Sequence, residues 1–349
     1  MKQLSKREIE SYCGDQAQLF HIRACTLEEG KSKNMKAYQV DNGMGLEFLV
    51  LPDKSFAIPQ LKFQGVNVGF ICKAGISAPE FYQEEGTRGF LRNFEAGFLT
   101  TCGLTYMGTP GVEDGQANGL HGIISNTPAE HTYSRIEWED DEAFITFGGE
   151  SREAHLFGPN MVIDRQFKIS TTENKILIHD VVTNKAFEDS PLMLLYHFNM
   201  GYPMLDGCSK TYSNMEQIGS RDGLSQEVCD NIDNFQEPTV GFEEEVFFRT
   251  TKEDTDKGYV VLHNPELEKA VVIKFDPKHL PILNQWKSPR AGDYALGLEP
   301  GTAHVGGRIR AKEEGILRYL GAGQSEVFDL EIEFIDCKTE NEKLLAFIK

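Results

Sequence analysis

Residues 161–184 have the sequence MVIDRQFKISTTENKILIHDVVTN, in which two largely apolar runs flank the polar segment TTEN. In the second run, the even-numbered residues from Ile176 to Val182 fall on one face of an extended chain, and the odd-numbered residues from Leu177 to Val181 fall on the other. Side chains of a β-strand alternate between its two faces. The stretch therefore predicts two antiparallel strands joined by a short turn.

The same plan recurs along the chain, because β-rich runs alternate with Gly, Asn and Pro. Further strand pairs are expected in KAYQVDNGMGLEFLVLP, SRIEWEDDEAFITFGG, GYVVLHNPELEKAVVIKFDP and GILRYLGAGQSEVFDLEIEFID, with turns at Asn42-Gly43, 139–142, Asn264-Pro265 and 321–323. Period-2 runs separated by turn residues are typical of antiparallel sheets.

Helical signals are confined to the two ends. Ser5 is a candidate cap for a short N-terminal helix that runs through Ile9. The segment from Thr339 to Glu342 resembles a capping box before the tail KLLAFIK. The chain shows no GxGxxG or P-loop motif and no repeat of fixed period. We therefore predict an all-β protein: one large antiparallel β-sandwich domain over residues 1–349, with a short N-terminal helix and a C-terminal helical tail.

Composition excludes several classes of partner. The 349 residues carry a net charge of −19, which argues against nucleic acid or an anionic membrane as the ligand. No run approaches the roughly 20 apolar residues of a membrane helix, and the charged N-terminus is unlike a secretory signal. The seven cysteines are scattered and form no CxxC pair, which predicts reduced thiols in a cytoplasmic protein. The isolated histidines show no HxH or HExxH spacing, so no metal or other cofactor is expected. The oligomeric state is not indicated.

Three side chains lie in contexts that suit proton transfer or ligand binding. His121 follows the Gly-rich stretch GTPGVEDGQANG, His197 ends the apolar run PLMLLYHFNM, and Glu299 ends the run YALGLEP. Each has a second interpretation from the residues alone. His197 fits a hydrogen-bonded core histidine, Glu299 a solvated loop carboxylate and His121 a turn residue that bonds its own loop.

Five motifs, taken in order, resemble landmarks of the aldose 1-epimerase, or galactose mutarotase-like, family. They are GFLTTCGL, LHGIISNTPA, LLYHFNMGYP, QWKSPRAGDYALGLEPGT and GILRYLGAGQSEVFDLEIEFI, and they span about residues 90 to 336. They are most similar to a less characterised branch of that family with a TCGL…HG signature. The resemblance implies a galactose mutarotase-like supersandwich whose concave sheet holds a small-molecule sugar.

The resemblance also implies roles for individual residues. Glu299 corresponds to the base that takes the proton of the anomeric hydroxyl, and His197 to the acid that protonates the ring oxygen. His121 corresponds to a residue that holds the substrate. An arginine commonly shares that task, and Arg92 is the candidate, with Arg88 near enough to compete.

The chemistry suits these residue types. Opening a cyclic hemiacetal removes one proton from the hydroxyl and delivers one to the ring oxygen, and a carboxylate with a protonated imidazole can do both near neutral pH. Trp286 offers an apolar platform for a sugar face, or alternatively a core side chain, and Asp206 is a weaker candidate for binding a hydroxyl.

Three functions remain open from the sequence. The first is an isomerase that interconverts the anomers of a sugar. The second is a carbohydrate-binding protein on the same scaffold without turnover, and the third is a glycoside-cleaving enzyme, which would need a second carboxylate across the sugar. The stretches around His121 and after His197 differ from those of the well-known sugar mutarotases. The substrate is therefore open among neutral, deoxy, phosphorylated, acidic and ketose sugars.

Overall fold

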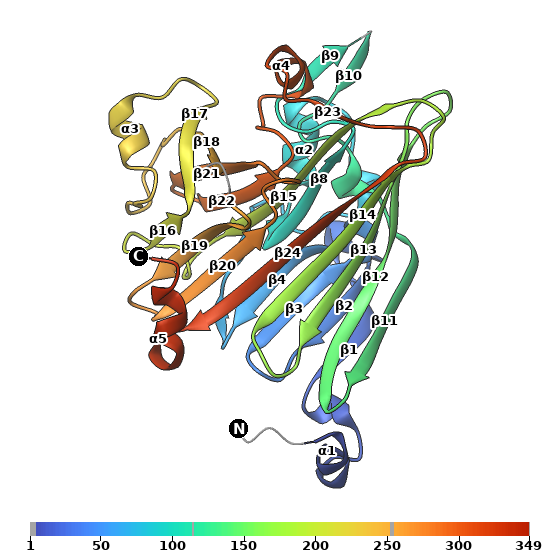
Figure 1. Ribbon diagram of the computed structural model, residues 1–349, viewed down its shortest axis with the longest axis vertical. Helices are drawn as coiled ribbons and strands as arrows, with labels where there is room; N and C mark the ends of the chain where they lie inside the picture. Colours follow the sequence, from blue (N-terminus) through green and yellow to red (C-terminus); the bar gives the residue numbers. More distant parts are fainter. Residues whose placement is uncertain (1–4, 114, 252–254, 349) are drawn as a thin grey trace.

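Two large antiparallel sheets packed face to face make up most of the molecule (Figure 1). The computed structural model describes residues 5–113, 115–251 and 255–348. The first sheet contains β1 (His21–Thr26), β2 (Lys36–Asp41), β3 (Leu46–Leu51), β4 (Ala57–Phe63), β5 (Val66–Asn67), β8 (Leu99–Leu104), β15 (Ser190–Met200), β17 (Met215–Ser220), β18 (Glu245–Thr251), β21 (Ile282–Arg290), β22 (Asp293–Gly301) and β23 (Arg318–Leu320). The second contains β11 (Glu130–Glu139), β12 (Glu142–Ala154), β13 (Asn160–Ser170), β14 (Lys175–Asn184), β16 (Lys210–Ser213), β19 (Gly258–Asn264), β20 (Lys269–Phe275) and β24 (Ser325–Asp336). The predicted antiparallel β-sandwich is confirmed.

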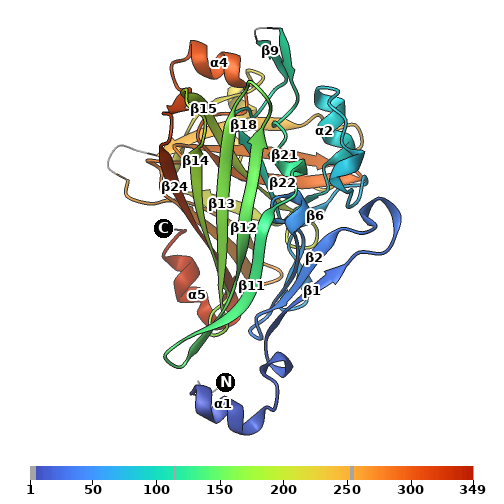
Figure 2. The same cartoon turned by 90° about the vertical axis from the view of Figure 1, so that its right-hand side faces the viewer.

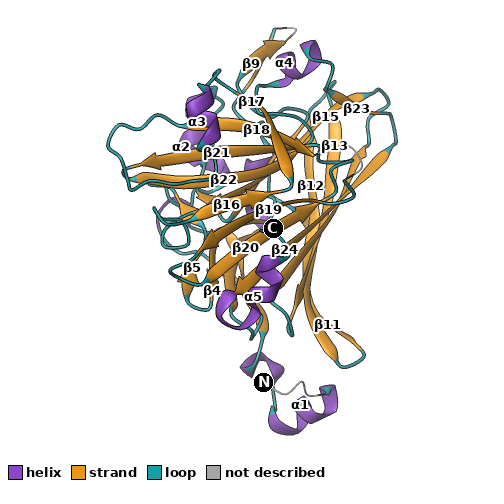
Figure 3. Ribbon diagram, turned by 60° about the vertical axis from the view of Figure 1, so that its left-hand side comes forward, coloured by secondary structure: helices purple, strands orange, loops and turns teal. Residues whose placement is uncertain are grey.

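Short elements surround the two sheets, with α4 and β9 at one end and α1 at the other (Figure 2). The two-stranded pairs are β6 (Phe70–Ile71) with β7 (Ala96–Gly97) and β9 (Gly111–Glu113) with β10 (Gln116–Asn118), and the α-helices are α1 (Lys6–Tyr12), α2 (Thr87–Asn93), α3 (Gln226–Asp230), α4 (Arg308–Glu313) and α5 (Cys337–Leu345). Single 3₁₀ turns cover Gln16–Gln18, Gly30–Ser32, Pro52–Lys54, Pro79–Phe81 and Ile124–Asn126. In all three whole-molecule views, α4 and the hairpin β9–β10 lie at one end, and α1 and α5 lie toward the other (Figure 3). No helix among the described residues is both long and apolar enough to cross a membrane.

Four of the five predicted hairpins are confirmed by the register of their strands. They are β2–β3, β11–β12, β13–β14 and β19–β20. In β14 the alternation is as predicted, since residues from Ile176 to Val182 with even numbers are buried and Leu177 and His179 are exposed. The Asn42-Gly43 turn forms because the Asn42 side-chain oxygen accepts hydrogen bonds from the backbone N–H groups of Met44 and Leu46.

The fifth hairpin prediction is wrong. β23 pairs with β15 in the first sheet, whereas β24 lies between β14 and β20 in the second. Both edges of β24 are therefore occupied, and the turn at 321–323 carries the chain from one sheet to the other. Gly and Asn in a turn mark a change of direction but do not identify the partner strand.

The terminal helices differ in how well their caps were predicted. Ser5 caps α1 in a full capping box with Glu8, as the sequence predicts for Ser5. The expected capping box from Thr339 to Glu342 is wrong. The helix begins at Cys337, and the Asp336 side chain accepts from the backbone N–H of Lys338. Glu340 leaves helical geometry with φ −129° and ψ 28°, so α5 is kinked where the cap was expected.

The main hydrophobic core fills the space between the two sheets, and β15 shows how it is built. Tyr196 and Phe198 point into this core. Met193 and Leu195 belong to a second apolar cluster on the opposite face of the first sheet, together with Phe90 and Phe94 near α2 and Val305 before α4. Because side chains alternate along a strand, His197 lies on the same face as Met193 and Leu195. The outer face of the first sheet is therefore where the candidate site lies.

Candidate active site

A cavity of about 870 Å³ opens on the outer face of the first sheet. Its floor is formed by side chains of β15, β21 and β22, and its walls by α2, α4 and the segments that flank β17 and β18. This volume lies within the range of roughly 300–1,000 Å³ that is usual for small-molecule sites. His121, His197, Trp286 and Glu299 all line it.

The register of β15 and β22 brings His197 and Glu299 together. Leu195 pairs with Gly301 and Phe198 with Leu298, which places residue 197 directly opposite residue 299. The distance from His197 Nε2 to Glu299 Oε1 is 3.3 Å, and both side chains are almost fully buried. His197 Nδ1 and Glu299 Oε1 make no hydrogen bond to any residue that the structure describes. Buried polar atoms normally have partners, so the pair retains unused hydrogen-bonding capacity beside the cavity.

Burial shifts the pKa values of His197 and Glu299 in opposite directions. Desolvation, with a smaller contribution from His121, lowers the pKa of His197 well below its usual value. Desolvation and the charge of Glu244 raise the pKa of Glu299 well above its usual value, although Arg221 opposes this shift. Both shifts favour the uncharged forms, a neutral imidazole and a protonated carboxyl group, over a buried ion pair. The pair still contains one proton donor and one acceptor.

His121 is held in an unusual backbone conformation at the edge of the cavity. Its φ is +61°, a left-handed value that His adopts more often than most residues. The Gly108 backbone N–H donates to His121 Nδ1 at 3.3 Å. Burial, reinforced by the nearby Arg221, lowers the pKa of His121 to about 3. The ring is thus neutral with its proton on Nε2, which makes it a hydrogen-bond donor to a ligand.

Aromatic rings surround the two histidines. Phe94 lies 5.2 Å from His197 and Phe90 lies 5.1 Å from His121, measured between ring centroids. The Trp286 ring meets His197 edge to face at 5.9 Å and 77°. An apolar ring beside polar groups is a common arrangement for sugar faces, because the C–H side of a sugar packs on the ring and its hydroxyls reach the polar groups.

The arginine at the cavity is not the one that the sequence suggested. Arg92 and Arg88 are exposed and do not line the cavity, and Arg92 instead pairs with Glu85 at 3.0 Å. Arg221, directly after β17, lines the cavity and acts electrostatically on His121 and Glu299. It belongs to the polar stretch 213–238, in which no motif or spacing distinguishes it. Only the pairing of β17 with β18 brings it to the site.

The family match covers most of the chain. Residues 32–334 match a family described as a domain of unknown function, DUF4432. The chain belongs to this family. No curated protein matches the sequence at a significant level.

Solved structures share the fold of this DUF4432 protein. A protein from Klebsiella pneumoniae named "putative aldose 1-epimerase" superposes with a TM-score of 0.85 at 22% identity, over 96% of this chain and 91% of that one. A galactose mutarotase-like protein from Clostridium acetobutylicum gives 0.62 at 14% identity, over 91% and 99% of the two chains. Galactose 1-epimerase from Lactobacillus acidophilus gives 0.55 at 11% identity, over 90% and 99%. At these identities the likeness establishes the mutarotase-like sandwich fold. The activity has to be inferred from the residues of the site.

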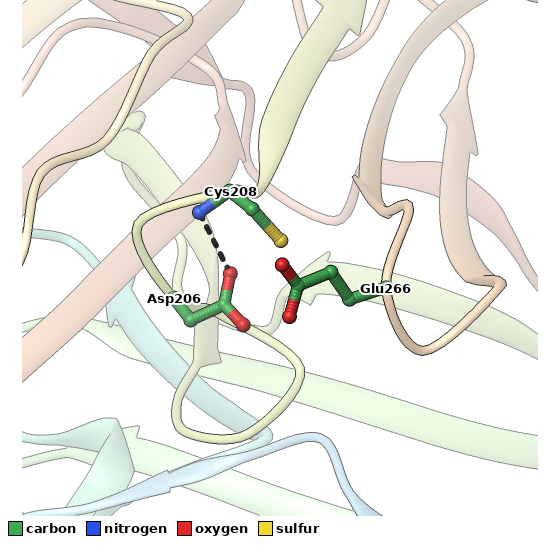
Figure 4. Close-up of side chains that lie close together, drawn as sticks. All are labelled: Asp206, Cys208 and Glu266. Carbon is green, nitrogen blue, oxygen red and sulfur yellow. Dashed lines mark hydrogen bonds between the residues drawn. The ribbon is translucent and has the colours of Figure 1, made fainter.

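Asp206 lies away from the cavity of this DUF4432 protein. Its carboxylate accepts from the backbone N–H of Cys208 at 2.9 Å and from Asn264 Nδ2 at 3.1 Å. The Cys208 thiol points toward the carboxylate of Glu266 (Figure 4). Ligand atoms of Asp206, Cys208 and Glu266 lie within 4.8 Å of one another. Burial and the hydrogen bond with Asp206 raise the pKa of Cys208 to about 11, so the thiol stays protonated. The geometry of Asp206 indicates that it holds its own loop together.

Proposed function

We propose that this protein is an isomerase of the aldose 1-epimerase type, which interconverts the anomers of a sugar. The observation that carries the proposal is the His197–Glu299 pair, with 3.3 Å between Nε2 and Oε1 on the floor of a cavity of about 870 Å³. His121 and Trp286 on the same cavity supply a hydrogen-bond donor and an apolar face. The fold likeness to a galactose 1-epimerase agrees with this assignment.

One titratable proton on the pair is sufficient for the reaction. One partner donates its proton to the ring oxygen while the other takes the proton of the anomeric hydroxyl, so that the bond from the anomeric carbon to the ring oxygen breaks and a carbonyl forms. After rotation, the ring oxygen attacks the other face of the carbonyl and both protons return. Because the two groups exchange roles between opening and closure, the reaction proceeds whichever partner holds the proton first.

A binding protein without turnover does not require a carboxylate that faces a histidine across the site. Glu299 lines the cavity and faces His197, whereas Arg92, expected to bind sugar in either case, does not line it. The geometry therefore favours proton transfer over binding alone.

The deciding experiment is NMR exchange spectroscopy, or polarimetry, on freshly dissolved sugars with the wild type and Glu299→Ala. The panel includes neutral, deoxy, phosphorylated, acidic and ketose sugars. We expect faster anomer exchange for at least one of them, lost in the variant. Exchange at the uncatalysed rate for every sugar, with saturable binding of one of them, would establish a binding protein instead.

A further inference from the structure

One carboxylate joins two walls of the cavity. Glu244, immediately before β18, accepts a hydrogen bond from Trp286 Nε1 at 2.8 Å through Oε2. Through Oε1 it pairs with Arg221 Nη2, also at 2.8 Å. Trp286 belongs to β21 and Arg221 follows β17, so Glu244 connects two strands that do not pair with each other. All three side chains line the cavity.

Glu244 also contributes to the charge around Glu299. Among the described residues, His197 contacts Glu299, and Cys102, Arg221 and Glu244 interact with it electrostatically, while His121 lines the same cavity. Among them, Glu244 opposes ionisation of Glu299 and Arg221 favours it. Of the other charged wall residues, Lys73 pairs with Asp293 and Arg310 with Glu314. Arg290 lies beside Asp293 at the β21–β22 turn. Glu244 is thus placed to offset the positive charge of Arg221 near the His197–Glu299 pair.

We propose that Glu244 is a positioning residue, which fixes Trp286 and Arg221 on the cavity wall and offsets the positive charge of Arg221 beside Glu299. The inference rests on the proposed function and deepens it, because it assigns a side chain that the sequence interpretation did not single out. It separates into two testable parts: the placement of Trp286, which needs a hydrogen-bond acceptor, and the charge balance, which needs a carboxylate.

Two substitutions separate these parts. Glu244→Gln keeps an oxygen that can accept from Trp286 but removes the charge. The alkaline limb of the pH profile reports loss of the last proton of the His197–Glu299 pair. Removing a negative neighbour and leaving Arg221 less neutralised both favour the ionised carboxylate of Glu299. This limb should therefore move to lower pH by a fraction of a unit, because Glu244 is nearly half exposed. KM should stay within about threefold of the wild type.

Glu244→Ala removes the acceptor as well. It should show the same shift of the alkaline limb and, in addition, a KM raised by about tenfold because Trp286 is no longer held. Asp222→Asn is the matched control, since Asp222 pairs with Arg221 at 2.9 Å, whereas the Trp286 indole donates to Glu244. It should shift the limb less than Glu244→Gln does. Equal shifts in both variants, or a Glu244→Gln profile that superimposes on the wild type, would overturn the inference.

A substrate-free readout separates this inference from the proposed function. The chain has two tryptophans, so Trp138→Phe leaves Trp286 as the only tryptophan. Its emission, beside His197, should titrate with the His197–Glu299 pair, and the midpoint should fall in Glu244→Gln. A lower midpoint without sugar turnover in the wild type would retain the inference and reject the isomerase. Turnover in the wild type with an unchanged midpoint and pH profile would reject the inference and retain the isomerase.

Discussion

Single residues acquire their roles here from the face of the strand that they occupy. On β15, Tyr196 and Phe198 are buried between the sheets, whereas His197 between them reaches the cavity. On β22, Leu298 is buried in the same core and Glu299 points the other way. A one-residue change of register would exchange these faces. The proton-transfer pair therefore depends on the same alternation that builds the core.

The His197–Glu299 pair should behave as one functional unit. Each of Glu299→Gln and His197→Ala is expected to lower the catalysed rate of anomer exchange by about 10²- to 10⁴-fold. The double variant should lose little more than the stronger single variant, because a proton cannot pass through a pair that lacks either member. NMR exchange rates measure the effect, and far-UV circular dichroism controls for folding. Losses that multiply in the double variant would show two independent contributions.

His121 should make the protein sensitive to acid. Its pKa is about 3 in the folded chain, below the value near 6.5 for an unfolded chain. Between these values the unfolded state binds one more proton, so the free energy of unfolding falls as pH decreases from about 6.5 toward 3. His121→Asn, which tolerates the positive φ, should remove about 1.4 kcal/mol per pH unit from this dependence. Urea unfolding of both proteins at pH 6, 5 and 4 measures it. Parallel curves for the two proteins would contradict the lowered pKa.

The sequence identified the proton-transfer candidates through motifs but could not identify every residue at the cavity. His121, His197, Trp286 and Glu299 lie within or beside ordered motifs and meet at the cavity. Arg221 lies in a stretch without local pattern, and its place depends on how β17 pairs. The lowered pKa of His197 and the raised pKa of Glu299 also follow from burial, which no linear motif encodes.

The two sheets are connected through a buried polar network between β13, β14 and β15. Arg165 on β13 donates to Asp180 on β14, with 2.5 Å from Nη2 to Oδ2, and to Thr101 Oγ1 on β8 at 2.6 Å. Tyr196 on β15 donates to the same Asp180 Oδ2 at 2.6 Å. The network lies on the core side of β15, directly behind His197. It therefore ties the strand that bears His197 to the opposite sheet.

Breaking this network on one side should destabilise the fold strongly. Arg165→Met leaves the carboxylate of Asp180 buried without its cation, which typically costs about 3–5 kcal/mol. Arg165→Met with Asp180→Leu should recover part of that loss, since no unpaired charge remains. Urea unfolding measures both. The control is Arg135→Met at the exposed Arg135–Glu137 pair, which should cost less than about 1 kcal/mol. Equal losses at the buried and the exposed pair would rule out this role for the network.

Local sequence patterns predicted individual strands better than they predicted which strands pair with one another. Hairpins with a polar turn and two alternating strands were recovered because adjacent runs pair across a short loop. β23 and β24 are also separated by a short turn, yet they lie in different sheets. A neighbour of β15 such as β8 is about a hundred positions away in sequence, so its pairing depends on long-range packing that alternation does not encode.

The ends of the chain differ in how they are attached to the sandwich. Helix α1 has no buried residue and stands away from the sheets in Figures 1 and 2. Helix α5 packs on the outer face of the second sheet, where Leu344 joins a cluster with Val272 and Ile335. Its tail adds contacts, since the rings of Tyr259 and Phe347 meet edge to face with 5.2 Å between their centroids. Both ends are helical, so the difference between them lies in burial.

The free energy of unfolding should therefore depend on the buried contacts of α5 and hardly on α1. Leu344→Ala removes a side chain that is 2% exposed and should lower the free energy of unfolding by about 2–4 kcal/mol. Leu345→Ala, at the adjacent exposed position in the same helix, should cost less than about 1 kcal/mol. Deleting the chain up to Tyr12 should also stay within about 1 kcal/mol, because no residue of α1 is buried. Urea unfolding, with anomer exchange as a second readout, distinguishes these cases. A deletion that destabilises the protein more than Leu344→Ala would mean that α1 contributes to the sandwich beyond its visible contacts.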